Sequence, residues 1–326
     1  MSLPESPTGD DYHGLTTIRA GTSPAPTMSV NRLCYSRACF SQHFYSCYHE
    51  IDKRKFVMSN EKELAYRYDL LITPDWRERF DLLISENVKL PTEGRILEVN
   101  CGTGALAIEL AEKMRGLGEV VGTDPSAERI EIARAKALVK KIDDVAFEQS
   151  SPDALRFDSF EFDAVIGDAS MLPPDELEDV LAEMIRVAQP DARVVLKIVT
   201  RGSFDEFFSI YWEALLGMGL SDEVWAELEA LIKARTIIED AERMAVREGL
   251  REVKSFTSKE EFSFETGDEF IESPLIKDVF LPEWFAIIPQ ERQEEIRDQL
   301  VSIIDRERYD APFDVSIKAT LIIGIK

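Results

Sequence analysis

Apolar and polar positions alternate in blocks along residues 95–200, and the blocks predict strands and helices in turn. Strands are expected at Arg95–Val99, Glu119–Asp124, Val145–Gln149, Phe162–Asp168 and Ala192–Thr200. Helices are expected at Ala105–Met114, at Ser126–Lys140 with Ser126 as the N-cap, and at Asp175–Ala188, where apolar residues recur at helical spacing. Strands that alternate with helices predict a parallel sheet covered on both faces.

The pattern changes after Thr200. Residues 204–247 are mostly helical in pattern, and a charged helix is expected at Gln290–Glu307. Two further strands are expected at Leu250–Ser258 and Asp314–Ile325. The pattern therefore predicts an α/β fold with a helical insertion between its closing strands.

A change of composition near Met58 divides the chain. All three histidines and three of the four cysteines precede it, and residues 1–57 carry five acids and six bases, which leaves 57 acids and 32 bases beyond. The early part is rich in Ser, Thr, Pro and Gly, so residues 1–57 are expected to be disordered or a non-native extension, with Met58 as the natural start. Its cysteines and histidines fit no zinc-binding spacing, so no metal site is expected.

The acidic charge narrows the classes of partner. The chain has 62 acids and 38 bases, a net charge of -24, which argues against nucleic acid and anionic membrane surfaces as partners. No apolar run reaches the ~18 residues of a membrane span, and the first thirty residues lack the apolar core of a secretory signal, so a cytoplasmic protein is expected. Residues 58–326 contain no histidine, which excludes histidine-based catalysis there.

The stretch "NCGTG" (Asn100–Gly104) turns the first strand into a helix. Gly102 and Gly104 allow the backbone to approach a ligand closely, and Asn100 is a residue type that tolerates positive φ. Asp124 ends the second strand twenty residues later, where a carboxylate can accept both hydroxyls of a ribose. The motif "GTGALA" fits a dinucleotide fingerprint, so NAD and S-adenosylmethionine both remain open at this point.

Four blocks resemble the motifs of class I S-adenosylmethionine-dependent methyltransferases. They are "LEVNCGTG", "VVGTDPSAERIEIAR", "SSPDALRFDSFEFDAVIGDASM" and "LAEMIRVAQPDARVVL", and the resemblance extends from Tyr66 to Thr200. It implies a doubly wound, mostly parallel seven-stranded sheet with an antiparallel terminal strand. The implied cofactor-binding residues are Glu98, Asn100, Cys101, Gly102, Thr103, Gly104, Asp124, Pro125, Ser151, Pro152, Asp153 and Asp168.

Two departures from the family pattern affect the cofactor site. Asn100 replaces the first glycine of the loop, which positive φ permits. Ser151 and Pro152 stand where the family commonly has an Asp and a backbone N–H that contact adenine, and proline has no N–H. Either Asp153 takes over this contact or the adenine contacts are weaker.

The acceptor is expected to be small and apolar or aromatic. Asp168, at the end of the fourth strand, is the candidate catalytic group, with a cap on the following turn as the alternative. Tyr68–Asp69 resembles a "YD" of the quinone-biosynthesis branch. The candidate substrate or lid residues are Tyr66, Tyr68, Trp76, Phe204 and Tyr211, and the aromatic stripe that begins at Phe204 fits core packing as well as a substrate wall.

The resemblance implies methyl transfer to a small molecule by in-line displacement. The domain expected at 58–326 then divides into cap helices (58–94), a cofactor-binding core (95–200) and a substrate or lid region with closing strands (201–326). Two alternatives stay open: a methyltransferase fold used as a non-catalytic binding or assembly subunit, and an NAD-dependent oxidoreductase. The sequence does not specify the oligomeric state.

Overall fold

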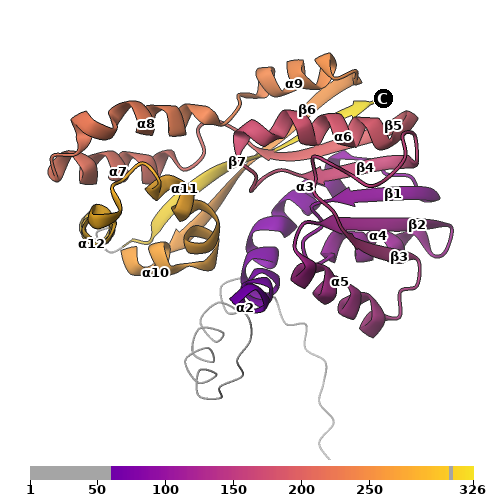
Figure 1. The fold of residues 1–326 in the computed structure, drawn as a ribbon, viewed down its shortest axis with the longest axis horizontal. Helices are drawn as coiled ribbons and strands as arrows, with labels where there is room; N and C mark the ends of the chain where they lie inside the picture. Colours follow the sequence, from indigo (N-terminus) through magenta and orange to yellow (C-terminus); the bar gives the residue numbers. More distant parts are fainter. Residues whose placement is uncertain (1–59, 308–310) are drawn as a thin grey trace, which may run out of the picture. The chain divides into compact units, whose positions relative to one another are not determined.

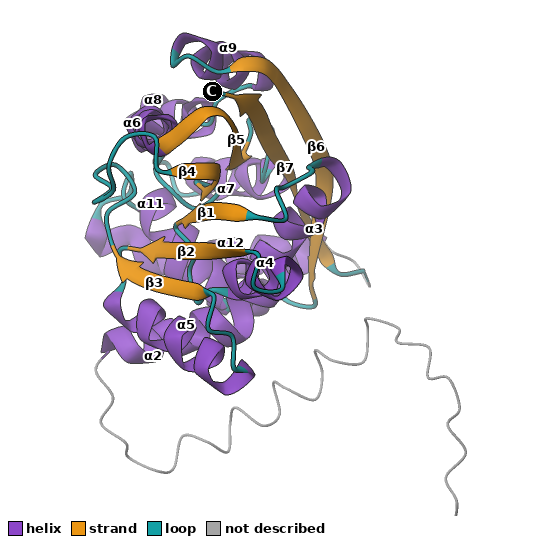
Figure 2. Ribbon diagram, turned by 90° about the vertical axis from the view of Figure 1, so that its right-hand side faces the viewer, coloured by secondary structure: helices purple, strands orange, loops and turns teal. Residues whose placement is uncertain are grey.

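The computed structural model describes residues 60–307 and 311–326, with the side chains of residues 221–223 excepted. The expected extension at 1–57, with its cysteines and histidines, lies outside the described residues. The described part is built on one seven-stranded sheet in the order β3-β2-β1-β4-β5-β7-β6 (Figures 1 and 2). Its strands are β1 (Gly94–Val99), β2 (Gly118–Asp124), β3 (Val145–Gln149), β4 (Phe162–Asp168), β5 (Ala188–Val199), β6 (Arg251–Phe264) and β7 (Phe313–Ile325).

The sheet is parallel except at β7, which pairs antiparallel with β5 and with β6. The expected α/β class and doubly wound sheet are confirmed, and the antiparallel strand is last in sequence but second from the edge of the sheet. The strand order reverses between β1 and β4. Ligands of open α/β sheets bind at the carboxyl ends of the strands beside such a reversal.

Helices cover both faces of the parallel strands (Figure 2). On one face α3 (Glu78–Asn87), α4 (Ala105–Met114) and α5 (Ala127–Lys140) pack on Ile96, Val120 and Ile166. On the other face α6 (Leu177–Val187) and α9 (Ile238–Arg247) pack on Leu97 and Val165. Because successive strand residues point to opposite faces, Ile96 and Leu97 enter different cores.

A third, aromatic core lies beyond the parallel strands. The C-terminal part of β6 and the N-terminal half of β7 pack there against helices that gather at one end of the sheet, on the left of Figure 1. These helices are α7 (Asp205–Gly217), α8 (Ser221–Ala234), α10 (Gly267–Glu272), η4 (Ile276–Phe280), α11 (Leu281–Phe285) and α12 (Gln293–Glu307). Short 3-10 turns precede α6 and α12, at Pro174–Glu176 and Gln290–Arg292.

One continuous helical segment precedes the first strand of the sheet. It consists of α2 (Asn60–Arg67), a π-helical stretch η2 (Tyr68–Arg77) and α3. Pro74 lies inside η2 and has no N–H to donate to a regular helical bond, which accounts for the wider winding.

Two strand boundaries differ from expectation. The strand β5 begins at Ala188, because a β-bulge before Arg193 lets Ala188 pair with Phe162. Asp191 within this bulge adopts a φ of 66°. The strand β6 continues to Phe264, six residues past the expected end, because its charged residues 259–261 pair along β7.

Candidate functional site

The glycine turn has the backbone that its sequence predicts. Asn100, Gly102 and Gly104 have φ values of 56°, 59° and 76°. The Asn100 side chain donates from Nδ2 to the carbonyl of Asp168 at 2.9 Å, which ties the carboxyl end of β1 to that of β4 across the strand reversal. A Cβ at Gly104 would lie 2.6 Å from the ring of Phe147, so only glycine fits there.

Asp124 joins the turn to the second strand. The Gly102 N–H donates to its Oδ2 and the Ser126 N–H to its Oδ1, both at 2.9 Å, and Arg129 lies 3.5 Å from Oδ1. Burial raises the pKa of Asp124, and Arg129 and the backbone donors oppose that rise. A carboxylate has about four lone-pair sites, so Asp124 retains acceptor capacity for a further hydroxyl.

The segment η2 covers the turn. A Cβ at Gly102 would lie 2.9 Å from the Tyr68 ring and 3.3 Å from Nη1 of Arg77. The guanidinium of Arg129, on α5, lies over the Tyr68 ring, 4.3 Å from its centroid. Asp69 accepts from Thr103 and pairs with Lys136 of α5. Asp124 is therefore only 1% exposed.

A buried cluster of five charges lies behind the turn. Arg77 donates to the Asn100 carbonyl at 2.8 Å and to Oε1 of Glu98 at 3.0 Å, and its Nη1 lies 3.3 Å from Oδ2 of Asp168. Lys197 of β5 is fully buried, with Nζ 2.9 Å from Asp81, 3.2 Å from Asp168 and 3.9 Å from Glu98. The cluster therefore holds three carboxylates and two cations.

Two carboxylates of the cluster, Glu98 and Asp168, differ in pKa. Burial raises the pKa of Glu98 to about 7, against the pull of Lys197 and Arg77. Burial would also raise the pKa of Asp168, but Lys197, Arg77 and two hydrogen bonds from Ser170 lower it to about 2. The difference has two structural causes: Lys197 lies 3.2 Å from Asp168 but 3.9 Å from Glu98, and Oδ1 of Asp168 also accepts from the Ser170 N–H and hydroxyl.

Asp168 has the capping role that its position suggested, and its catalytic role stays a prediction. Its Oδ1 caps the turn that follows β4, and its Oδ2 lies at ion-pair distance from two cations without an aligned hydrogen bond. Trp76 donates to the Ser170 hydroxyl at 2.8 Å and so anchors η2 to this turn.

The expected adenine side lies at the end of β3. Ser150 donates its N–H to the carbonyl of Asp124 at 3.2 Å, which brings the following turn beside the second strand. Ser151 and Asp153 are exposed and hydrogen-bond to each other, while Pro152 is buried. The Pro125 carbonyl accepts from Gln149 at 2.9 Å.

The remaining aromatic candidates lie in different environments. Trp76, Phe204 and Tyr211 are fully buried in the aromatic core, which favours packing over a substrate wall. Tyr66 is 49% exposed.

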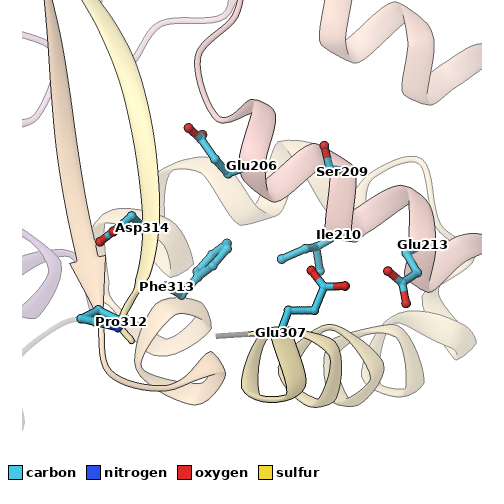
Figure 3. Close-up of a pocket in the computed structure, with 8 residues that line it drawn as sticks. All are labelled: Glu206, Ser209, Ile210, Glu213, Glu307, Pro312, Phe313 and Asp314. Carbon is cyan, nitrogen blue, oxygen red and sulfur yellow. The ribbon is translucent and has the colours of Figure 1, made fainter. Parts of the chain in front are cut away.

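Two cavities are relevant to the search for an acceptor site. One of about 620 Å³ adjoins the loop after β4 and is lined by Met171, Pro173, Pro174, Asp175, Ala234, Val279, Pro282 and Glu283. The other, of about 430 Å³, lies between α7 and the start of β7 and carries four carboxylates (Figure 3). Of these two cavities, the first adjoins the turn that Asp168 caps.

Sequence reasoning missed Arg77, Lys197 and Asp81. A lysine inside the apolar run "VVLKIV" was a signal, because an isolated charge in a buried strand needs partners. Nothing in the sequence showed that Arg77 reaches the same carboxylate. Among the described residues no group of side chains could hold a metal ion, and no helix there combines the length and hydropathy of a bilayer crossing.

The site fits S-adenosylmethionine by its donors and acceptors. Glu98 is fully buried with one oxygen lacking a hydrogen bond, whereas Oδ2 of Asp168 already lies beside Arg77 and Lys197. Buried carboxylate oxygens without hydrogen-bond donors suit the positively charged methionine end of this cofactor. Asp124 suits its ribose.

Comparisons with known proteins identify the family of the chain. The methyltransferase-domain family model matches residues 96–191. A demethylmenaquinone methyltransferase of Thermus thermophilus is 34% identical over 165 residues, which cover 47% of this chain and 72% of that protein. The demethylmenaquinone methyltransferase of Lactococcus lactis is 40% identical over 101 residues, 31% of this chain and 40% of that protein.

A ubiquinone/menaquinone biosynthesis C-methyltransferase of Citrifermentans bemidjiense is 29% identical over 156 residues, 45% of this chain and 65% of that protein. The chain thus spans less than two thirds of the Lactococcus and Citrifermentans proteins. Because the match to the Thermus protein covers most of that enzyme, this chain belongs to the class I S-adenosylmethionine-dependent methyltransferases, in the group that includes the demethylmenaquinone methyltransferases.

Proposed function

We propose that this protein transfers a methyl group from S-adenosylmethionine to a carbon atom of a small quinone-like acceptor. The observation that carries the proposal is the hydrogen bond from Gly102 to Asp124, which couples the glycine turn to the ribose-binding acid. The names of the relatives support the acceptor class and the carbon atom. The apolar lining of the cavity beside the β4 loop suits such a ring.

The protein's own side chains bind the cofactor and orient it toward the acceptor. A bound S-adenosylmethionine supplies a methyl group on a sulfonium. Asp124 accepts hydrogen bonds from the ribose hydroxyls, and Glu98 and Asp168 offer negative charge to the methionine end. As the acceptor carbon forms its bond to the methyl carbon, the sulfur–methyl bond breaks and the acceptor releases a proton to solvent or a base. The protein contributes alignment and exclusion of water.

Entry of the cofactor requires a movement of η2. Arg129 lies over the Tyr68 ring and 3.5 Å from Oδ1 of Asp124, whose exposed fraction is 1%, so Arg129 and Tyr68 must move before a ribose can reach the carboxylate. The bonds of Asp69 to Thr103 and Lys136 join the same elements and can reform over the bound ligand.

The net charge of the protein bears on its choice of partner. A net charge of -24 disfavours nucleic acid as a partner and supports a small-molecule acceptor.

The test replaces the carboxylate and leaves its shape. Asp124→Asn removes the charge and one acceptor, and we expect the affinity for S-adenosylhomocysteine to fall at least roughly tenfold by titration calorimetry. Asp143→Asn, at an exposed position before β3, is the matched control and should bind as the parent does. Equal binding by the Asp124 variant would remove the basis of the proposal. A parent protein that binds no nucleoside at millimolar concentration would favour the non-catalytic alternative.

A further inference from the structure

The charge balance of the buried cluster has a consequence for ligand choice. Glu98, Asp168 and Asp81 contribute three negative charges, and Arg77 and Lys197 contribute two positive ones. Four of the five side chains are at most 5% exposed, and that of Asp81 is 12% exposed. With all groups ionised, the cluster carries one negative charge that no cation of the cluster balances.

The unbalanced charge lies at the carboxyl end of β1, where Glu98 is the next-to-last residue. Oε2 of Glu98 is buried and accepts no hydrogen bond, whereas Oδ2 of Asp168 lies 3.3 Å from Arg77 and 3.2 Å from Lys197. Arg77 contacts the carbonyl of Asn100, so the cluster borders the glycine turn itself. A buried carboxylate oxygen without a donor is costly, and a cation placed there offsets the cost.

The two forms of the expected cofactor differ by one charge. S-adenosylmethionine has a carboxylate, an ammonium and a sulfonium, a net charge of plus one. S-adenosylhomocysteine, the product, lacks the sulfonium charge and is neutral overall, with nearly the same shape. An electrostatic preference for the first over the second can therefore be read as a ratio of two affinities, in which contacts common to both ligands cancel.

We propose that the cluster of Arg77, Lys197, Glu98, Asp168 and Asp81 is matched to a ligand of one positive charge, and that its unbalanced carboxylate makes the site prefer S-adenosylmethionine over its uncharged product. This inference rests on the proposed function. The preference reduces inhibition by the product. Glu98 supplies the charge, and Asp81, on α3 behind Lys197, sets the balance without lining the turn.

The groups that face Glu98 come from four elements. They are Arg77 of η2, Asp81 of α3, Asp168 of β4 and Lys197 of β5, and the Cys101 thiol also interacts with Glu98. Burial raises the pKa of Glu98 to about 7, so the preference should strengthen as the pH rises through neutrality. The pKa of Asp168 is lowered to about 2, so that carboxylate stays charged throughout.

The experiment measures both dissociation constants by calorimetry at pH 7.5, without acceptor, in four proteins. Glu98→Gln brings the cluster to neutrality, and we expect the affinity ratio of S-adenosylmethionine to S-adenosylhomocysteine to fall roughly tenfold, as for a unit charge within about 10 Å in a medium of dielectric constant near 20. Asp81→Asn makes the same change of charge farther from the turn, and should lower the ratio by a smaller factor. Asp143→Asn, outside the cluster, should leave it unchanged.

The outcomes separate this inference from the proposed function. If the parent binds neither ligand, the proposed function fails and this inference with it. If both ligands bind and the ratio is the same in the parent and in the Glu98 and Asp81 variants, only the inference fails. If the Glu98 variant does not fold, the Asp81 variant decides by its ratio.

Discussion

The stability of the folded protein should fall as the pH rises from about 4.5 to about 7, and Glu98 should be responsible. This carboxyl group is fully buried on β1, and burial raises its pKa from 4.5 to about 7 in the folded protein. Between these values the folded state holds a proton that the unfolded state has lost. The raised pKa of an acid therefore destabilises the fold as the pH increases, and the penalty is complete above about pH 7.

The magnitude follows from the two pKa values. A shift from 4.5 to about 7 corresponds to about 3 kcal/mol once both states are ionised, at about 1.4 kcal/mol per unit. Between pH 5 and pH 8 the part due to Glu98 is about 2.5 kcal/mol, because at pH 5 the unfolded state has already lost most of its proton. Asp168, with a pKa lowered to about 2, is ionised in both states over this range and adds no slope.

Urea unfolding at pH 5 and pH 8 tests this reasoning through a comparison of variants. Glu98→Gln keeps the shape of the side chain and cannot ionise, so its unfolding free energy should change less between the two pH values than that of the parent, by about 2.5 kcal/mol. Glu148→Gln, at an exposed position of β3, should keep the pH dependence of the parent. Parallel dependences for the parent and the Glu98 variant would show that Glu98 does not titrate in this range, and would refute the argument.

Two further substitutions probe the turn and the cluster. Gly102→Ala places a Cβ 2.9 Å from the Tyr68 ring at a φ of 59°, whereas Gly219→Ala meets no atom within 4 Å at a φ of 70°; both should lose about 1–2 kcal/mol to the left-handed backbone, and only the first should also weaken S-adenosylhomocysteine binding in calorimetry. Lys197→Met leaves Asp168 and Asp81 without their shared cation and should cost about 3–5 kcal/mol in urea unfolding, and a loss below about 1 kcal/mol would contradict the ion pairs described above.

Local chemistry explains which parts of the site could be predicted from sequence. Asn100, Gly102 and Gly104 are residue types that suit positive φ, and all three adopt it. Ser126 accepts from the N–H of Arg129 as an N-cap should. Such features depend on neighbours in the chain, so a sequence pattern contains them.

Features that depend on distant partners were not accessible in the same way. The β6 residues 259–261 read as polar, and only their pairing with β7 makes them part of a strand. Phe204 and Tyr211 have the spacing of a helix face, and spacing cannot tell a core from a substrate wall. Arg77 and Lys197 converge on Asp168 from elements 120 positions apart in the chain, which no local pattern records.

The location of the buried charges indicates what they are for. Replacement of a buried ion pair by apolar residues of similar volume is often neutral or stabilising, so stability alone does not explain five charges in one cluster. The aromatic core around Trp284 and Phe207 shows that this chain can fill space with apolar side chains when packing is the only demand. The charges instead occupy the carboxyl edge at the reversal of strand order, where a ligand binds, and one of them costs about 3 kcal/mol at neutral pH. A cost of this kind, confined to one edge, is what a site matched to a charged ligand requires, because the negative charge must be in place before the ligand arrives.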